Sequence, residues 1–454
     1  MKRRERKMKK VLSCALALSL LTAGTAFASG YRIPVQSIDS TAKSGANIAS
    51  ASSADAAFDN PAAMSFLKPG WLVEVDGTYL HLSSVKYSDN GGIGSALYGP
   101  GGANGKSEDE DYIIPTLFAV SPEWNNMRFG FSITTPYGMG KRWPSNGMDN
   151  IYPATFASKF ELRITDFNPT VTYAITDKLS VAGGLRLLYG SATLMNQGVP
   201  YVFAMSDIAP SQALSGDAWG WGYNLAIDYK ATKEWNFAAT FRSKADLNFS
   251  GDVLMGAVMN TPMGFIPVGS FAMNGKVTVI APAVFALSTA YSWDKFTLEL
   301  TLDRTFWSAY NQLNFSYDQQ IPGLNAGPGA PFGPQEKNWK DANAIRLGLE
   351  YNVVKPLTLM AGLCYDHGGA PDATLGFELP DSDAWSFSLG ARYAVTDRLD
   401  IGLAGLYDRL SSRSVNQITG VSPTGEVEYT GQGMDGKFTD SSAVLVTLGI
   451  QYRF

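Results

Sequence analysis

Two histidines, His81 and His367, are the side chains best suited to act as a base in hydrolysis by a nucleophilic serine. His81 lies in a strand-like stretch between Leu80 and Leu82, and His367 opens a loop before two glycines. Neither histidine lies in a recognisable nucleophile motif. The sequence therefore predicts that the protein is not an enzyme, and hydrolysis of lipids is kept as a distant alternative.

Two long segments between strand-like runs, about 196–216 and 252–271, are more apolar than exposed loops normally are. An apolar patch that faces water costs free energy unless something covers it, and methionine adapts to ligands of varied shape. Two interpretations are open: a groove that captures a hydrophobic ligand, or a lid in which the segments pack on each other. The residues predicted to contact a ligand in such a groove are Val199, Tyr201, Phe203, Met205, Leu254, Met255, Met259, Phe265 and Phe271.

An acidic run from Ser107 to Asp111 ends another long segment. Carboxylates bind divalent cations, but a run of five residues specifies no metal by itself. A solvated loop explains the run better. We therefore predict neither a metal site nor a cofactor.

The first 28 residues have the form of an export signal. Seven Lys and Arg residues precede an apolar run from Val11 to Leu21, and Ala26-Phe27-Ala28 is a small-x-small cleavage site. The apolar run has about half of the ~20 residues that a helix needs to cross a bilayer, and no other stretch is long and apolar enough. Residence in a membrane would therefore require a β-barrel.

Cysteine content and charge exclude two further classes of protein. Cys14 lies within the signal, which leaves Cys364 alone in the exported chain and excludes an internal disulfide framework. Removal of the signal takes away seven basic residues and Glu5, a net of +6, so the formal charge of −5 becomes −11. Because phosphate contacts need clustered Lys and Arg, this charge argues against binding of nucleic acid.

From Trp71 to Phe454, strand-like runs are joined alternately by short turns and by long Gly/Pro-rich loops. In the run from Phe296 to Asp303, apolar residues alternate with Thr, Glu and Asp, which would place apolar side chains on lipid and charged ones in a lumen. Fourteen such runs can be counted, and an even number suits a single-chain barrel. The interpretation is an all-β fold, a 14-stranded antiparallel transmembrane β-barrel over residues 69–454. Any single strand, taken alone, could equally belong to a soluble β-sandwich whose apolar face is a dry core.

The segment from Ser29 to Leu67 is rich in Gly, Ala and Ser and fits neither a strand nor a convincing helix. We interpret residues 29–68 as an N-terminal hatch, or plug, inside the lumen, where small side chains allow close packing. In its Asn60-Pro61-Ala62 turn, proline sets φ at about −65°, and the asparagine side chain can form a hydrogen bond with nearby backbone groups. Asn60, Pro61 and Ala62 are the predicted gate residues.

Several motifs resemble the FadL family of outer-membrane transporters for long-chain fatty acids and other hydrophobic compounds. They are Ser29-Gly30-Tyr31, Asn60-Pro61-Ala62 before the first strand, Asn168-Pro169-Thr170-Val171-Thr172-Tyr173 running into Thr176-Asp177-Lys178-Leu179-Ser180-Val181, Leu379-Pro380-Asp381, and Tyr452-Arg453-Phe454. The likeness spans nearly the whole mature chain. It implies a fourteen-stranded barrel, a hatch inside it, a hydrophobic groove formed by the third and fourth extracellular loops, an apolar pocket near the hatch, and a kinked third strand that opens the wall toward the bilayer.

The third strand corresponds here to the run from Met127 to Thr135, which meets Pro136-Tyr137-Gly138. Proline cannot donate to the strand ladder and glycine tolerates a bend, so a break in pairing is physically reasonable there. Alternatively, Pro136 merely starts a loop. In the first interpretation, Pro136 and Gly138 mark the lateral opening.

A fatty-acid carboxylate inside the barrel needs a cation or hydrogen-bond donors, because burying it unpaired is costly. Arg163, on the strand before the Asn168-Pro169 motif, is the first candidate, and Arg32 in the hatch is the second. Four more arginines are expected to face the lumen and, for the most part, to pair with acidic residues there. They are Arg186, Arg242, Arg346 and Arg392, with Asp228, Glu299, Asp303 and Glu350 as the expected partners.

The resemblance implies passive transport of hydrophobic molecules across the bacterial outer membrane, with long-chain fatty acids as the first expectation and aromatic or alkane hydrocarbons as the alternative. The implied route begins at the third and fourth loops and ends sideways near the third strand. An open hydrophilic porin is another interpretation, against which the hatch argues. Expected partners are the hydrophobic ligand, outer-membrane lipid and lipopolysaccharide, and the barrel assembly machinery, which would recognise the terminal Phe454. The barrel is expected to be monomeric.

Overall fold

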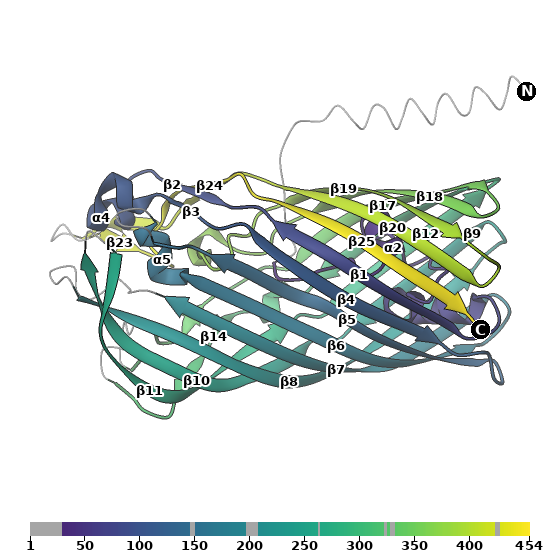
Figure 1. Ribbon diagram of the computed structural model, residues 1–454, viewed down its shortest axis with the longest axis horizontal. Coiled ribbons are helices and arrows are strands. Elements are labelled where there is room, and N and C mark those ends of the chain that lie inside the picture. Colours follow the sequence, from purple (N-terminus) through teal and green to yellow (C-terminus); the bar gives the residue numbers. More distant parts are fainter. Residues whose placement is uncertain are drawn as a thin grey trace, which may run out of the picture.

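The computed structural model describes residues 30–145, 150–196, 208–261, 264–321, 325–326, 332–422 and 427–454. Its strands form one closed antiparallel β-barrel, seen lengthwise in Figure 1. Seventeen paired strands make fourteen spans. The difference arises because β9 with β10, and β11 with β12, are two halves of one span, and β15 is a short strand beside β11. The predicted all-β, 14-stranded barrel is confirmed.

The spans follow one another around the barrel in chain order, and β1 pairs with both β4 and β25, which closes the ring. They are β1 (Leu72–Leu82), β4 (Glu110–Val120), β5 (Met127–Arg142), β6 (Lys159–Ala174), β7 (Leu179–Asn196), β8 (Ile208–Lys230), β9 (Trp235–Arg242) with β10 (Ala245–Thr261), β11 (Gly264–Ala281) with β12 (Val284–Trp293), β13 (Phe296–Thr305), β17 (Ala342–Val354), β18 (Leu357–Asp366), β19 (Ala384–Ala394), β20 (Leu399–Leu410) and β25 (Ser442–Arg453).

Side chains alternate between the two surfaces of the barrel wall. In β13, Leu298 and Leu302 are exposed on the outer surface, whereas Glu299 and Asp303 are buried inside. An apolar exterior and a polar interior are the reverse of a soluble core and are typical of a barrel in a lipid bilayer. A soluble β-sandwich is thereby excluded.

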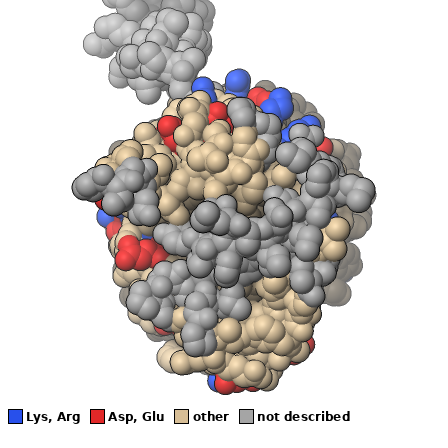
Figure 2. All heavy atoms as spheres, turned by 90° about the vertical axis from the view of Figure 1, so that its left-hand side faces the viewer, with Lys and Arg blue, Asp and Glu red and all other residues tan. Residues whose placement is uncertain are grey.

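Longer segments gather at the end of the barrel opposite the C-terminus (Figure 1). The ring of Phe377 packs there against the rings of Tyr87, Trp143, Tyr152 and Phe438. Seen from outside, charged side chains lie mostly around the rim of this end (Figure 2). The elements outside the spans are β2 (Lys86–Asp89), α4 (Ile93–Ala103), β3 (Gly105–Lys106), α5 (Ile151–Ala157), η3 (Trp307–Ala309), β14 (Gln312–Leu313), β15 (Phe315–Tyr317), β16 (Gln335–Glu336), η4 (Asp372–Thr374), β21 (Arg413–Asn416), β22 (Ile418–Val421), β23 (Val427–Tyr429) and β24 (Asp435–Thr439).

The segment 252–271, which the sequence suggested to be a loop, is a paired hairpin. β10 and β11 remain in register up to Thr261 opposite Gly264, apart from one shift after Ala257. The residues that suggested a loop are paired as strands, because strand formation depends on the neighbouring strands and not on composition alone.

The N-terminal segment, residues 30–68, is almost entirely buried. It contains α2 (Ile38–Ala42), α3 (Ala56–Asp59) and η2 (Pro61–Phe66). The side chain of Ser37 caps α2 by accepting from the Ser40 N–H. The segment forms hydrogen bonds with strands from all around the barrel, including β5, β8, β13, β17 and β19. It therefore lies inside the lumen. Among the described residues, no helix is long and apolar enough to cross a membrane.

Candidate ligand cavity and lateral opening

The barrel wall is interrupted between β4 and β5. Pairing between these two strands covers four residues of each and ends where Leu117 lies opposite Ile133. Toward the capped end, the next backbone bond across the gap is the Glu108 N–H donating to the Arg142 carbonyl oxygen at 2.9 Å. We call the unpaired stretch between them, residues 110–116 of β4 and 134–141 of β5, the window.

The window exists because β5 bends away from β4. Its register with β6 shifts between Thr134 and Tyr137, with Pro136 inside the shift. A bulge of this kind bends a strand, and proline tolerates it because it has no N–H to pair. The structure thus places Pro136 and Gly138 within β5, at a break in its pairing with β4, and not at the start of a loop.

The N-terminal segment covers part of the free edge of β5. The Ile33 N–H donates to the Pro136 carbonyl oxygen at 2.8 Å, and the Gly138 N–H donates to the Tyr31 carbonyl oxygen at 2.9 Å. Buried backbone groups need partners, and here residues of the hatch supply those that β4 no longer provides. The hatch and the window are therefore parts of one structure.

A cavity of about 740 Å³, which we call the window cavity, lies behind the window and borders it on both strands. Part of its lining is an apolar cluster that includes Val35, Leu80, Ile114, Leu406 and Leu445. Pockets of several hundred Å³ with mostly apolar walls suit hydrophobic small molecules.

A second cavity of about 570 Å³ adjoins the first toward the capped end and shares Leu162, Ala192 and Leu379 with it. At its polar edge, Lys337 and Glu378 form an ion pair at 2.6 Å. Burial alone would raise the pKa of Glu378, but the ammonium group of Lys337 holds it below its ordinary value. This cavity offers hydrophobic space between the capped end and the window cavity.

Tyr112 lies in the window. Its hydroxyl donates a hydrogen bond to the carboxylate of Glu110, and both side chains occupy the space that a side chain at Gly140 would fill. Glycine at this position therefore makes room for the Tyr112 ring between the strands. Sequence reasoning missed Tyr112, and the Gly138-x-Gly140 spacing is the signal that could have drawn attention to this part of the wall.

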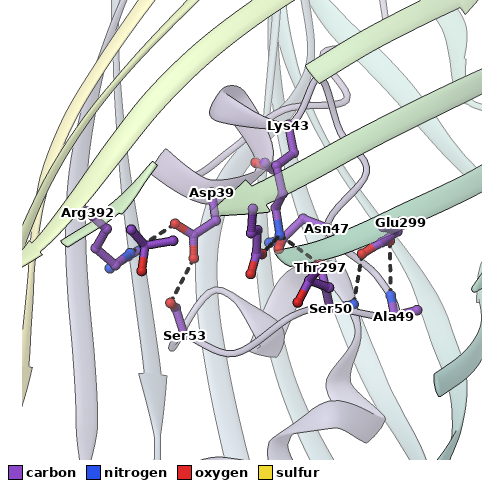
Figure 3. A network of polar contacts seen from close by, with 12 residues as sticks. Asp39, Lys43, Asn47, Ala49, Ser50, Ser53, Thr297, Glu299 and Arg392 are labelled. Carbon is purple, nitrogen blue, oxygen red and sulfur yellow. Dashed lines mark hydrogen bonds and ion pairs between the residues drawn. The ribbon is translucent and has the colours of Figure 1, made fainter. Parts of the chain in front are cut away.

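The hatch is fixed to the barrel by charged groups (Figure 3). Arg392 of β19 pairs with Asp39 of the hatch and Glu74 of β1, each at 2.9 Å. Lys43 pairs with Glu350 at 2.5 Å. Glu299 accepts hydrogen bonds from three consecutive hatch N–H groups, residues 48 to 50, at 2.7 to 3.0 Å. Charge-assisted bonds of this kind are stronger than neutral ones, so the hatch is firmly held.

The predicted turn at Asn60-Pro61-Ala62 opens η2. The Asn60 side chain accepts from the Ala62 N–H at 3.2 Å and donates to Ile48 and to Asp228 of β8. Next to it, burial raises the pKa of Asp59 to about 7, and Asn47, Arg242 and Lys43 offset only part of that effect. The turn therefore joins two parts of the hatch to the barrel wall beside an acid that titrates near neutral pH.

Arg163 does not point into the lumen, contrary to the expectation. It is exposed, and it alternates with the buried residues Leu162 and Ile164 on β6. Although it borders the window cavity, it lies at an outward register position. Alternation alone does not decide which of the two sets of residues on a strand faces inward.

Arg32 lies at the inner end of the window cavity and pairs with Asp303 at 2.7 Å. Arg346 pairs with the other oxygen of the same carboxylate at 2.5 Å, which confirms the expected pairing of Arg346 with an acid of the interior. A ligand carboxylate would have to compete with Asp303 for Arg32.

The other arginines of the interior have different partners from those expected. Arg186 pairs with Asp166 at 2.7 Å, and Arg242 lies over the ring of Phe58. The expected acidic partners instead bind the hatch: Asp228 accepts from Asn60, Glu299 from hatch N–H groups, and Glu350 from Lys43.

The predicted loop groove is only partly within the described residues. Val199, Tyr201, Phe203 and Met205 lie outside them. Met259 and Phe265 lie in the paired hairpin β10–β11. Met255 is fully buried against Val253, Met273 and Phe332, whereas Leu254 is exposed on the opposite surface, and Phe271, the strand partner of Met255, is exposed beyond this buried cluster. The residues of β10 and β11 therefore do not all line one groove, because adjacent strand residues face opposite ways.

Residues 19–454 match the protein-family model described as outer membrane protein transport protein, OMPP1/FadL/TodX. The chain belongs to this family. The resemblance to FadL proteins seen in its motifs is confirmed, and membership places the protein in the bacterial outer membrane. Members of the FadL/TodX family are transport proteins.

Relatives within the FadL/TodX family have low sequence identity but long alignments. The chain is 25% identical over 333 residues to a long-chain fatty acid transport protein of Escherichia coli, covering 67% of this chain and 71% of that one. It is 24% identical over 462 residues to a 47 kDa outer membrane protein of Pasteurella multocida, covering 98% of each chain.

Solved structures of FadL and TodX proteins share the fold. A Pseudomonas aeruginosa FadL homologue superposes with a TM-score of 0.76 at 18% identity, covering 94% of this chain and all of the other. The Pseudomonas putida toluene transporter TodX superposes with a TM-score of 0.68 at 17% identity, covering 93% of this chain and 99% of TodX.

Proposed function

We propose that the protein is a passive channel for hydrophobic molecules, with long-chain fatty acids as its first substrate class. The observation that carries the proposal is the apolar window cavity, which borders an unpaired stretch of the barrel wall. A hydrophobic molecule in this cavity is separated from the bilayer by side chains and not by a continuous strand ladder. Release into the membrane then needs no passage through water.

The hatch supports a sideways exit. Its residues fill the lumen below the window cavity and are bonded to strands on several sides of the barrel. Passage straight through the barrel would require separating these charge pairs, which leaves buried charges without a partner, and removal of one partner from such a pair costs about 3–5 kcal/mol. A route through the window leaves most of them intact.

Capture of the ligand is assigned to the capped end, where the second cavity leads into the window cavity. The apolar residues of the segments 196–216 and 252–271, Tyr201 and Phe203 among them, would collect the ligand from lipopolysaccharide-rich surroundings. Names of family members span two hydrophobic classes: one relative is called a long-chain fatty acid transport protein and one structural neighbour a toluene transporter. Hydrocarbons are therefore the alternative substrate, carried by the same route.

Filling the window tests the proposal. Gly138→Phe places a ring beside Ile33 and Leu162 at the edge of the window cavity. We expect uptake of a fluorescent long-chain fatty acid by cells that depend on this protein to fall at least about tenfold, the effect of ~1.4 kcal/mol on a barrier.

The matched control is Gly77→Phe on β1, an exposed position where an added side chain meets open space. This variant should transport at the normal rate. Equal uptake by the Gly138→Phe and Gly77→Phe variants, both present and folded in the outer membrane, would contradict lateral release.

A further inference from the structure

Lys141 projects into the window cavity from the capped end of β5. Only 3% of the residue is exposed in total, and it lines the cavity beside the window. The bulge at Pro136 explains its direction. Before the bulge, the even-numbered residues Arg128, Ser132 and Thr134 face inward, whereas after it odd-numbered residues such as Lys141 face inward. Arg142, the next residue, accordingly faces outward and pairs with Glu161.

The ammonium group of Lys141 has no ion-pair partner among the described residues. Its one hydrogen bond within this part of the chain is to the Ser107 hydroxyl oxygen, at the long distance of 3.5 Å. Ions buried without a partner are costly. By contrast, Arg32 and Arg346, which also line the window cavity, are both engaged with Asp303.

Two acidic side chains, Glu110 and Asp109, exert the strongest electrostatic effect on Lys141, but both have other hydrogen-bond partners. Glu110 accepts from the Tyr112 hydroxyl, and Asp109 accepts from the Ser84 N–H at 2.5 Å. They reduce the electrostatic cost of the ammonium group without contacting it. Lys141 therefore lines the cavity as a buried cation whose ammonium group pairs with no carboxylate of the described residues.

This geometry points to Lys141 as the binding group for the carboxylate of an amphiphilic ligand in the window cavity. The inference rests on the proposed function and narrows it: the favoured substrate is a hydrophobic chain with one anionic end, and not a neutral hydrocarbon. The chain would lie against Leu80, Ile114 and Leu406, and the carboxylate would accept hydrogen bonds from the Lys141 ammonium group beside the window.

Competition binding tests the inference on the full-length protein in a non-ionic detergent. Radiolabelled palmitate is displaced at pH 8 by unlabelled palmitate, by 1-hexadecanol or by hexadecane, which share one chain length and differ in the head group. We expect the wild-type protein to prefer palmitate over hexadecanol by about tenfold or more, since hydrogen bonds to charged groups contribute more than neutral ones.

Lys141→Met should remove this preference, because the affinity for palmitate should fall at least about tenfold while the affinity for hexadecanol stays unchanged. Lys141→Arg should retain the preference for palmitate. Lys437→Met, at an exposed lysine of β24, is the control and should bind like the wild type. Arg163→Met tests the rival cation at the outer border of the cavity.

Each outcome is decisive. A preference that survives in Lys141→Met, or disappears in Arg163→Met instead, would overturn the assignment. Binding of hexadecanol and hexadecane as tight as that of palmitate would also overturn it, while leaving a channel for hydrophobic molecules in place. Failure of all three to bind folded protein would contradict the proposed function itself.

Discussion

At the scale of single residues, one glycine and one tyrosine define the space in the window. Gly140 has no side chain, and the Tyr112 hydroxyl with the Glu110 carboxylate occupies the volume beside it. A side chain held across a gap in the strand ladder can move aside without breaking backbone hydrogen bonds. The wall is thus closed here by a side chain and not by backbone pairing.

Tyr112→Ala should speed up ligand release. Removal of the ring clears the window, and each ~1.4 kcal/mol taken from the barrier raises the rate about tenfold. Tyr112→Phe retains the ring and loses only the bond to Glu110, so it should transport at the wild-type rate. Uptake of a fluorescent fatty acid, normalised to the amount of folded barrel, distinguishes the variants; equal rates for the Ala and Phe variants would show that the ring is no obstacle.

Residue-level prediction succeeded where a single residue determines local conformation. Pro136 indicated the break in β5, and Asn60-Pro61 indicated a turn that the structure contains. It failed where the answer depended on strand phase. Arg163 was expected inside and lies outside, while the bulge brings Lys141 inside although strict alternation from Arg128 would place it outside. A shift of one residue exchanges the two faces of a strand, and the position of such a shift depends on tertiary packing.

At the scale of elements, the hatch is held by buried ionisable groups, and its docking should respond to pH. The pKa of Asp59 is raised from 3.8 to about 7 by burial in the docked hatch. The docked state therefore binds this proton more tightly than an exposed state does. Docking is strongest below about pH 4, weakens as the pH rises from about 4 to about 7, and changes little above that.

Asp59→Asn should remove this dependence and strengthen docking at pH 8, because the neutral amide can still accept the hydrogen bond from Asn47. Protease cleavage of the hatch, followed between pH 5 and pH 8, provides the measurement. Asp177→Asn, in an exposed short turn, serves as the control. If wild type and Asp59→Asn show the same pH profile, Asp59 does not govern docking in this range.

Elements were predicted best where alternation is regular and turns are short. The fourteen spans could be counted from the sequence, because lipid-facing and lumen-facing residues alternate along each of them. The hairpin β10–β11 was mistaken for a loop, since its Gly, Pro and Met content resembles a loop even though its strand partners follow one another closely in the chain.

At the scale of the whole molecule, the barrel and the hatch depend on each other unequally. Every span pairs with a neighbouring span, and β1 with β25 closes the ring without any hatch residue. Deletion of residues 30–67 should therefore leave a folded barrel with a polar lumen open to water. We expect steady single-channel currents from the deletion variant and only brief or small currents from the wild type. An equally tight deletion variant would contradict the role of the hatch as a plug.

The hydrogen bonds that join Tyr31 and Ile33 to β5 affect how the barrel can associate with other protein chains. An unpaired strand edge invites strands of other chains, and proteins commonly cover such edges to avoid aggregation. The window leaves an edge of β5 unpaired by β4, and other barrels that are folding in the same membrane carry strands that can pair with such an edge. By occupying the edge of β5 from inside, the first residues of the hatch leave the proposed exit for small molecules free of backbone pairing while they close this edge to strands of other proteins.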